Sequence, residues 1–214
     1  MKIFSLNNSS LLEVKEAVLK IIRHGGIVAV PTDTVYGLIG DASSKKAIAK
    51  LFAIKNRPKE KAFPVFVSNI AMARRYAYIS DVKARFLEKV WPGAVTVIFH
   101  HKEKLPPILT GNLDTVALRM PNSPFLEELM KNLDFPLCQS SANISGNVPA
   151  ETSQEIVCAF EASNHKPDAV VDGGVIDGSS SLLIDYTKNN PMILRSGIMT
   201  INELNLLLDQ AAEV

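Results

Sequence analysis

The sequence predicts an α/β fold in which helices and strands intermingle along the whole chain. Helix-start signals recur from Ser10 to Glu203, and short apolar runs of strand length lie between them. The chain has 214 residues, of which 47% are hydrophobic and 21% charged, as is typical of a globular protein that buries a full core. No Pro-, Gly- or Ser-rich linker divides it, so we expect one domain over residues 1–214.

Capping signals predict where the helices begin. Ser10 and Glu13 form a capping box, and the Gly25-Gly26 pair predicts the end of that helix. Ser123 is a predicted N-cap, because Pro124 suits the first helical position. The other predicted starts are the capping boxes Thr152–Glu155 and Thr200–Glu203, and two further helices are predicted over Ser44–Lys55 and Asp81–Val90.

The predicted strands are short runs rich in valine, isoleucine and phenylalanine, flanked by turn residues. They are Ile27–Val30, Phe63–Val67, Ala94–Phe99, Val116–Met120, Phe135–Cys138, Ala169–Val171, Leu182–Ile184 and Met192–Leu194.

Charge and composition narrow the function classes. The net charge of +1 gives no global field for nucleic acid or membrane binding, but seven cations against one acid lie between Lys45 and Lys61. These cations form either a solvated helix face or a stripe that faces an anion. No signal peptide and no apolar run of roughly 18 residues is present, so we expect a cytoplasmic protein that does not cross a membrane.

The two cysteines, Cys138 and Cys158, have no metal or redox spacing. We expect both to be buried thiols in a reducing compartment. Cys138 lies next to the candidate site described below and could be reactive.

Polar residues follow the first predicted strand. Thr32, Asp33 and Thr34 come directly after Pro31, which stops the strand, and Gly37 predicts a backbone turn. Ligands bind at such strand ends in open α/β sheets. The alternative is an ordinary turn whose hydroxyls bond to local backbone.

Two distant segments have the composition of two halves of one phosphate site. Lys55-Asn56-Arg57-Pro58 offers two cations at a helix end, and Ser140–Gly146 offers hydroxyls and an amide in a predicted loop. Arginine presents a planar fork to phosphate, and backbone N–H groups of a loop can form an anion nest. The alternatives are cations that answer the helix dipole and a polar surface turn. If the segments meet, we expect a nucleotide enzyme, although neither a Walker A nor a GxGxxG motif is present.

Two more arginines lie in or after apolar strands. Arg119 falls inside the run Thr115–Pro121, where burial would require a partner, either a ligand carboxylate or an internal acid. Arg195 follows a strand and precedes Gly197.

In this order, the segments resemble the YrdC-like family of threonylcarbamoyl-AMP synthases. The resemblance runs from about Val14 to Gly197, nearly the whole chain, and its motifs are modest singly but specific together. They are the Gly25-Gly26 pair, Pro31–Leu38, Lys55–Pro58, Trp91-Pro92-Gly93, Ala117–Pro121, Ser141–Gly146 and Leu194–Gly197.

The resemblance implies a twisted mixed β-sheet flanked by helices, with a large concave basic cavity. It also implies that L-threonine, bicarbonate or CO2, and ATP become threonylcarbamoyl-AMP and pyrophosphate. The implied cofactor is Mg2+, arriving with ATP, and no dedicated metal site is expected in the chain. A separate transferase complex would use the adenylate to modify tRNA, and direct tRNA or RNA binding stays open.

Site residues carry over position by position. Lys55, Arg57, Ser141 and Asn143 match the family's catalytic signature, and the first three also match ATP contacts. Thr115 and Arg195 match further nucleotide contacts. The matches to threonine contacts are Thr34, Arg119 and Ser181.

Some positions depart from the family pattern. Asp33 stands where many members have glutamate, Phe66 where some have a histidine near the threonine, and Ser196 where a proline is common. We expect the short form, without the extra C-terminal domain of longer members. Two alternatives stay open: an enzyme that forms carbamoyl-adenylate without threonine, and an RNA-binding module of the same fold without turnover.

Overall fold

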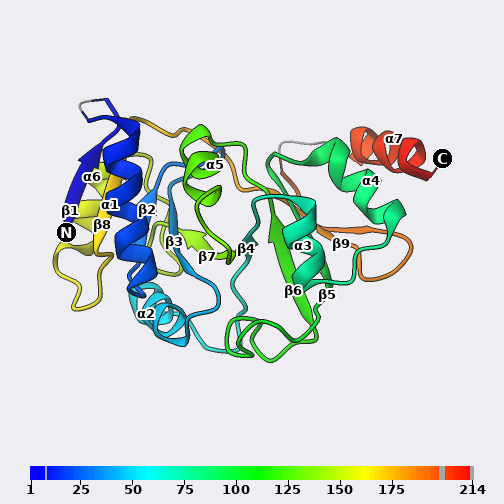
Figure 1. The fold of residues 1–214 in the computed structure, drawn as a ribbon, viewed down its shortest axis with the longest axis horizontal. Coiled ribbons are helices and arrows are strands. Elements are labelled where there is room, and N and C mark those ends of the chain that lie inside the picture. The colour runs from blue at the N-terminus through cyan, green and yellow to red at the C-terminus, as the bar shows by residue number, and fades with distance from the viewer. Residues whose placement is uncertain (8, 198–200, 213–214) are drawn as a thin grey trace.

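The computed structural model describes residues 1–7, 9–197 and 201–212, and its core is one ten-stranded mixed sheet (Figure 1). The strands are β1 (Lys2–Ser5), β2 (Val28–Val30), β3 (Gly37–Asp41), β4 (Val65–Phe66), β5 (Val95–His100), β6 (Thr115–Arg119), β7 (Leu137–Ser141), β8 (Ala169–Asp172), β9 (Leu182–Asp185) and β10 (Met192–Arg195). The helices are α1 (Leu11–Arg23), α2 (Lys45–Lys55), α3 (Ile70–Tyr76), α4 (Asp81–Val90), α5 (Pro124–Met130), α6 (Ser153–Glu161) and α7 (Ile201–Ala212).

Neighbouring strands follow the order β1-β8-β2-β3-β7-β4-β6-β5-β9-β10. Parallel pairs join β1 to β8, β8 to β2, β4 to β6 and β5 to β9, and the other pairs are antiparallel. The predicted α/β fold with a twisted mixed sheet is therefore confirmed. Segments far apart in sequence, such as β3 and β7, become direct neighbours in space.

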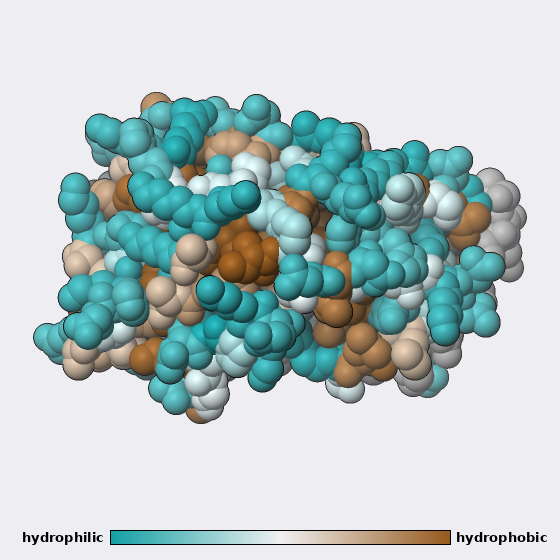
Figure 2. Space-filling view, turned by 90° about the horizontal axis from the view of Figure 1, so that it is seen from below, coloured by the Kyte–Doolittle hydropathy of each residue, from teal (hydrophilic) through white to brown (hydrophobic). Residues whose placement is uncertain are grey.

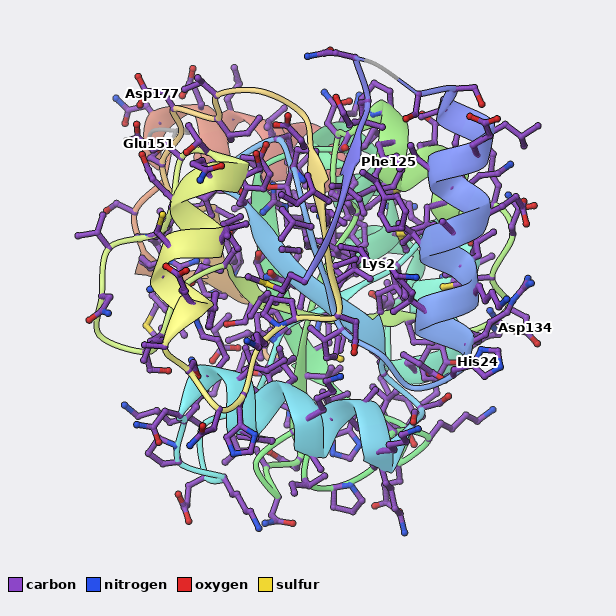
Figure 3. All side chains as sticks on the ribbon, turned by 90° about the vertical axis from the view of Figure 1, so that its left-hand side faces the viewer. Lys2, His24, Phe125, Asp134, Glu151 and Asp177 are labelled. Atoms are coloured by element: carbon purple, nitrogen blue, oxygen red, sulfur yellow. The ribbon has the colours of Figure 1, made fainter. Side chains whose placement is uncertain are left out.

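Helices cover both faces of the sheet, and each face has its own apolar core. One core packs α1 and α5 against residues such as Val28, Val30 and Phe66. The other packs α2, α4 and α6 against the opposite face, including Ala29, Leu38 and Val65. Figure 3 shows α1 and α6 on opposite sides of the strands at one end of the molecule, with α2 below. The alternation of Val28, Ala29 and Val30 between the two cores follows from the strand period of two.

Most predicted helix boundaries are confirmed. Ser10 and Glu13 form the capping box of α1, and Gly25 ends this helix with a φ of +77°, a value that glycine adopts without strain. Ser123 caps α5 with Pro124 at the first turn. Thr152 caps α6, but the Glu155 carboxylate accepts the N–H of Glu151 instead of that of Thr152, so this box is only half formed. The predicted cap Thr200 lies outside the described residues.

Two turn predictions are wrong because strand pairing overrides local composition. Gly37 does not form a turn: it begins β3, where it pairs with Val30 and Ser141. Ser140 and Ser141 belong to β7 and not to the loop after it. Three elements were not predicted, namely β1, β3 and α3. Their local signals are weak, since two glycines interrupt β3 and α3 has seven residues.

The surface is mainly hydrophilic on the side of α2, where hydrophobic groups form separate patches (Figure 2). No helix in the described part of the chain is long and apolar enough to cross a membrane. The cations between Lys45 and Lys61 do not form one continuous face. Lys46 donates to the carbonyl of His24 and Lys50 pairs with Asp168, whereas Lys55 is buried.

Candidate active site

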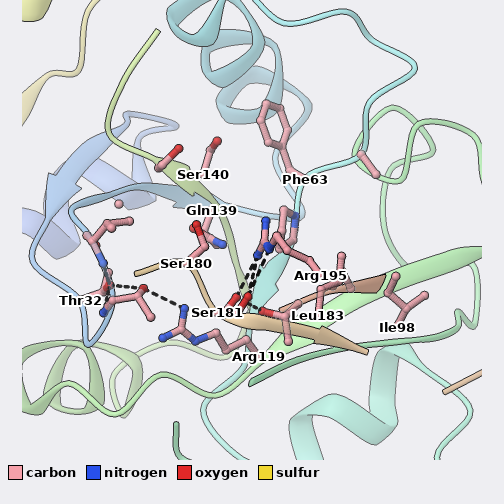
Figure 4. Close-up of a pocket in the computed structure, with 18 of the residues that line it drawn as sticks. Thr32, Phe63, Ile98, Arg119, Gln139, Ser140, Ser180, Ser181, Leu183 and Arg195 are labelled. Carbon is pink, nitrogen blue, oxygen red and sulfur yellow. Dashed lines mark hydrogen bonds between the residues drawn. The ribbon is translucent and has the colours of Figure 1, made fainter. Parts of the chain in front are cut away.

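A cavity of about 340 Å3 opens beside the central strands (Figure 4). Hydroxyl side chains and arginines from distant segments line it, together with Gln139 and apolar residues. The hydroxyl residues are Thr32, Thr34, Thr96, Ser140, Ser141, Ser180 and Ser181, and the arginines are Arg57, Arg119 and Arg195. The family resemblance implies a cavity that is large and basic, and both properties stay predictions.

The two predicted halves of the phosphate site meet. The Lys55 ammonium donates to the carbonyl oxygens of Ser141 (2.8 Å) and Asn143 and to Asn143 Oδ1 (2.7 Å). In return, the N–H of Ser145 donates to the Lys55 carbonyl (3.0 Å). The end of α2 is thus bound to the end of β7 and the loop that follows it.

The charge of Lys55 is surrounded by neutral oxygens. Three carbonyl oxygens match its three N–H donors, and its side chain is 2% exposed. Burial, with a further contribution from the nearby Arg57, lowers the pKa of Lys55 to about 7. No carboxylate among the described residues forms an ion pair with Lys55. Its buried charge therefore carries a desolvation cost that an anionic ligand would offset.

Ser141 and Asn143 are held by the same network. The Ser141 hydroxyl donates to Asn143 Oδ1 (2.6 Å), and Asn143 Nδ2 donates to the carbonyl of Asn147. In this arrangement the Ser141 hydrogen is used within the protein, and a ligand contact that needs it would require the hydroxyl to rotate.

Arg57 lines the cavity directly. Its Nε and one terminal nitrogen donate to the carbonyls of Lys61 (3.1 Å) and Ala62 (2.9 Å), and its guanidinium lies 5.0 Å from the centre of the Phe63 ring. The other terminal nitrogen has no acceptor among the described residues. Arg57 is therefore oriented by backbone while part of its donor fork stays available. Partial burial lowers its pKa.

Arg119 is buried and is held from several sides. Its guanidinium donates to Asp33 Oδ1 (2.6 Å), Thr34 Oγ1 (3.1 Å) and the carbonyl of Gly93 (3.0 Å). The centre of the Phe66 ring lies 5.7 Å from the guanidinium carbon. Burial lowers the pKa of Arg119 and the Asp33 carboxylate opposes that shift. Of the two partners left open by the sequence, the internal acid is present.

Ser181 and Arg195 form a third cluster. Arg195 donates to the Ser181 carbonyl (3.0 Å) and hydroxyl (3.2 Å) (Figure 4). The Ser181 hydroxyl lies 2.8 Å from that of Thr96. This cluster joins β10 to the pocket end of β9 and to β5.

The segment between β8 and β9 packs against the Thr32–Thr34 segment. The Tyr36 hydroxyl donates to the Gly174 carbonyl (2.7 Å) and accepts the N–H of Gly173 (3.0 Å). A Cβ at Gly178 would lie 1.8 Å from the carbonyl oxygen of Thr34, which explains why a glycine stands there. This packing brings Ser180 and Ser181 to the cavity.

Of the predicted site residues, Thr34, Arg57, Arg119, Ser141, Ser181 and Arg195 line the cavity. Lys55 and Asn143 lie behind this lining and bond to Ser141. Thr115 does not line it, although it shares a face of β6 with Ala117, which does. The ligand roles of all nine residues stay predictions.

Cys138 is not a reactive thiol. It is fully buried on β7, and burial raises its pKa to about 12, so the thiolate is disfavoured. Cys158 is exposed, and the prediction that both thiols are buried is wrong for this residue.

Four further residues shape the site. Thr32 and Asp33 were predicted, with Thr34, as a polar cluster at a strand end where a ligand could bind, whereas Tyr36 and Thr96 were not predicted as site residues. Tyr36 lies in the same Pro31–Leu38 motif, whose density of polar side chains was the available signal. Thr96 has no such signal, since it lies within an apolar strand and is revealed only by the β5–β9 pairing.

The chain matches the model of one protein family over residues 20–197. That family comprises Sua5, YciO and YrdC, and its description is "Telomere recombination". The match covers most of the chain.

The chain belongs to the Sua5/YciO/YrdC family.

Members with curated names are similar over most of this chain. The threonylcarbamoyl-AMP synthase of Pyrococcus abyssi is 34% identical over 191 residues, which are 88% of this chain and 55% of that protein. A putative threonylcarbamoyl-AMP synthase of Methanocaldococcus jannaschii is 32% identical over 95% of both chains. The crystal structure of P. abyssi Sua5 complexed with L-threonine superposes with a TM-score of 0.87 at 29% identity, covering 96% of this chain and 60% of that one. This family member therefore spans little more than half the length of the Pyrococcus relative.

Proposed function

We propose that this protein is an L-threonylcarbamoyladenylate synthase, which makes threonylcarbamoyl-AMP and pyrophosphate from L-threonine, bicarbonate or CO2, and ATP. The observation that carries the proposal is one cavity with two different cationic ends. One end combines Arg57 with the Lys55 network, and the other is the Arg119–Asp33–Thr34 cluster. The names of two relatives support it: the longer Pyrococcus protein is a threonylcarbamoyl-AMP synthase, and the Methanocaldococcus protein of similar length is a putative one.

The two ends suit the two substrates. The triphosphate would bind Arg57 and Ser141, with Lys55 and Asn143 holding the Ser141 segment in place, and Thr115 and Arg195 would contact the nucleotide. The carboxylate of threonine would bind the remaining N–H groups of Arg119, with Thr34 and Ser181 nearby. In this reading Lys55 acts through the position of Ser141 and through its charge.

The chemistry requires positioning and charge stabilisation. The amine of threonine is first carboxylated to a carbamate, whose oxygen attacks the α-phosphorus of ATP as the bond to pyrophosphate breaks. Negative charge grows on the leaving group, where Arg57 and Lys55 would stabilise it. Holding a labile carbamate beside ATP can contribute on the order of 7–11 kcal/mol through orientation alone.

Mg2+ does not fit as a resident cofactor of this cavity. Its lining contains arginines and hydroxyls but no carboxylate, and no group of three or more metal-binding side chains occurs in the described part of the chain. Mg2+ would enter with ATP, bound by phosphate oxygens and water.

The same proposal extends to the location of the protein, its domain organisation and the use of its product. We propose a cytoplasmic enzyme with one YrdC-like domain over residues 1–214, consistent with the continuous sheet. Its product would pass to a threonylcarbamoyl transferase complex that modifies tRNA, and direct RNA binding is tested separately.

An assay with radiolabelled bicarbonate tests the function. Labelled adenylate should form only when threonine and ATP are both present. Adenylate formation with carbamoyl substrates but without threonine would favour the carbamoyl-adenylate alternative. RNA binding that ATP does not displace, without turnover, would favour the binding module.

Substitutions at the phosphate end test the site. Lys55→Ala and Arg57→Ala should each lower adenylate formation at least about tenfold, or about 1.4 kcal/mol of barrier. Lys45→Ala is the matched control, since Lys45 is an exposed lysine of the same helix. Circular dichroism would verify that each variant is folded. Near-normal pyrophosphate release by both site variants would contradict the assignment.

A further inference from the structure

Gly37 differs from every other glycine in the described part of the chain, which contains all eleven. Four of the others have a φ between +63° and +95°, a region that glycine adopts without strain. At the remaining six, an added Cβ would lie 2.8 Å or less from another atom, so packing leaves no room for a side chain. Gly37 has neither property. Its φ lies outside the left-handed region, and the atom nearest to an added Cβ is 3.3 Å away.

The space beside Gly37 belongs to the cavity. The three atoms closest to an added Cβ are the Thr32 methyl carbon (3.3 Å), the Ser140 carbonyl oxygen (3.6 Å) and the Gln139 side-chain oxygen (3.9 Å). All three residues line the cavity (Figure 4), and so does Gly37. A methyl group at this position would therefore stand in the cavity, and a small shift of the Thr32 methyl would accommodate it.

Glycine is an unfavourable residue at this point of the sheet. Gly37 begins β3, where it pairs with Val30 on one side and with Ser141 on the other. A strand glycine loses more backbone freedom on folding than any other residue, and it has no side chain to pack on its neighbours. Neither the backbone conformation nor the packing of the protein requires it here. The remaining reason for a glycine within a strand is the close approach of a ligand to the backbone.

Gly37 lies between the two ends of the cavity. Residues directly opposite in an antiparallel pair have side chains on the same face, so an added Cβ would stand beside the Ser141 side chain. On its other side is Thr32, whose hydroxyl lies 3.0 Å from that of Thr34. Ser141 belongs to the proposed phosphate end and Thr34 to the proposed threonine end. Groups bound at the two ends would therefore meet above Gly37.

We propose that the missing side chain of Gly37 reserves the room in which the carbamate and the α-phosphate meet. This inference rests on the proposed function. In that reaction the carbamate oxygen forms its bond to the α-phosphorus while the bond from this phosphorus to the pyrophosphate oxygen breaks, so both groups must occupy one place at the same time. A methyl group at Gly37 would hold them apart, and a misplacement of about 1 Å can cost about a hundredfold in rate.

Kinetics and binding of Gly37→Ala test this inference. The variant should melt within about 3 °C of the wild type, because the methyl needs little room from the protein and alanine restricts the unfolded chain. Its kcat for adenylate formation should be at least about tenfold lower. Its affinities for L-threonine alone and for a non-hydrolysable ATP analogue alone should each change by less than about threefold, because each ligand by itself occupies one end. Gly37→Ser, with a larger side chain, should lose at least as much kcat.

Gly40→Ala is the matched control, because it adds the same methyl group to the same strand outside the cavity. Its Cβ would lie 2.5 Å from Cδ1 of the fully buried Ile27, so this variant should melt at a lower temperature than Gly37→Ala. Its folded form should keep kcat within about twofold of the wild type. An equal loss of kcat in the two alanine variants would contradict the inference.

The other outcomes are distinct. If the wild type forms no adenylate, the proposed function fails and this inference fails with it. If the wild type is active and Gly37→Ala keeps its kcat, only the inference is overturned. A melting temperature of Gly37→Ala as low as that of Gly40→Ala would also overturn it, because packing would then account for the glycine. So would a loss of affinity for one substrate alone that equals the loss of kcat, since Gly37 would then lie under that substrate and not between the two.

Discussion

The Lys55 end and the Arg119 end of the cavity differ in what compensates the buried positive charge. Around Lys55 the acceptors are neutral carbonyl and amide oxygens, so its charge is solvated but not cancelled. Around Arg119, the Asp33 carboxylate at 2.6 Å cancels the charge within the protein. The two ends were both predicted as anion sites, yet they are electrostatically unlike.

The difference fits two kinds of ligand. An uncompensated lysine and the partly free fork of Arg57 favour a polyanion such as a triphosphate. A neutral arginine–aspartate pair favours a ligand with no net charge that still carries a carboxylate, as a free amino acid does. Charge compensation, more than the number of cations, distinguishes the two halves of the proposed site.

The largest expected effect is on stability at the Arg119 end. Asp33→Ala leaves a guanidinium that is 3% exposed without its carboxylate, and breaking such a buried pair costs about 3 kcal/mol or more. Asp81→Ala is the control, because Asp81 is 85% exposed in its pair with Arg74 and should cost less than about 1 kcal/mol. Urea unfolding of both variants measures the two costs. Equal costs would show that Arg119 does not depend on Asp33.

A smaller effect should appear in the pH dependence of stability at the Lys55 end. The folded pKa of Lys55, about 7, lies below its ordinary value of 10.5. Between these values the unfolded chain holds the proton that the folded chain has lost, so the free energy of unfolding rises with pH. From pH 7 to 8.5 we expect a rise of about 1–2 kcal/mol. The raised pKa of Cys138 opposes this trend only above pH 9, its ordinary value.

Lys55→Met is the control for that measurement. Denaturant unfolding at several pH values should give a flat profile for this variant over the same window. A wild-type profile that is flat or falls would show that Lys55 keeps its proton in the folded protein.

The smallest expected effect is a difference in salt dependence between the two substrates. Raising NaCl from low to moderate concentration should weaken binding of an ATP analogue by about threefold or more, because salt screens the long-range attraction between the triphosphate and the uncompensated cations. Threonine affinity should change by less than about twofold, since its end of the cavity is neutral. Titration calorimetry at two salt concentrations measures both. Equal salt dependence would remove the distinction between the ends.

The sequence alone predicted the fold class and the contact between the Lys55 segment and the segment that contains Ser141 and Asn143. Capping residues, apolar runs and the family motifs report on local structure, and the motif order reports on the topology. Strand β3 was missed because Gly37 and Gly40 lower its strand propensity, while its pairing with β2 and β7 stabilises it.

The sequence alone does not predict which residues pair with the buried charges of the site. Nothing local to Asp33 shows that it pairs with a residue 86 positions away. This pairing depends on the tertiary fold that brings the Thr32–Thr34 segment to the end of β6. The same holds for the cations of α2, which point to several different partners although they are close in sequence.

Strand β4 has one more consequence. Its two residues, Val65 and Phe66, pair with Cys138 and Leu137 on one side and with Leu118 and Arg119 on the other. A single strand therefore separates β7, which ends at Ser141, from β6, which ends at Arg119, and two interstrand steps amount to about 10 Å. Because β7 runs antiparallel to β6, Ser141 lies four residues beyond Leu137, the β7 residue that is level with Arg119. The separation of the two proposed ligand positions is thus set by strand spacing and register.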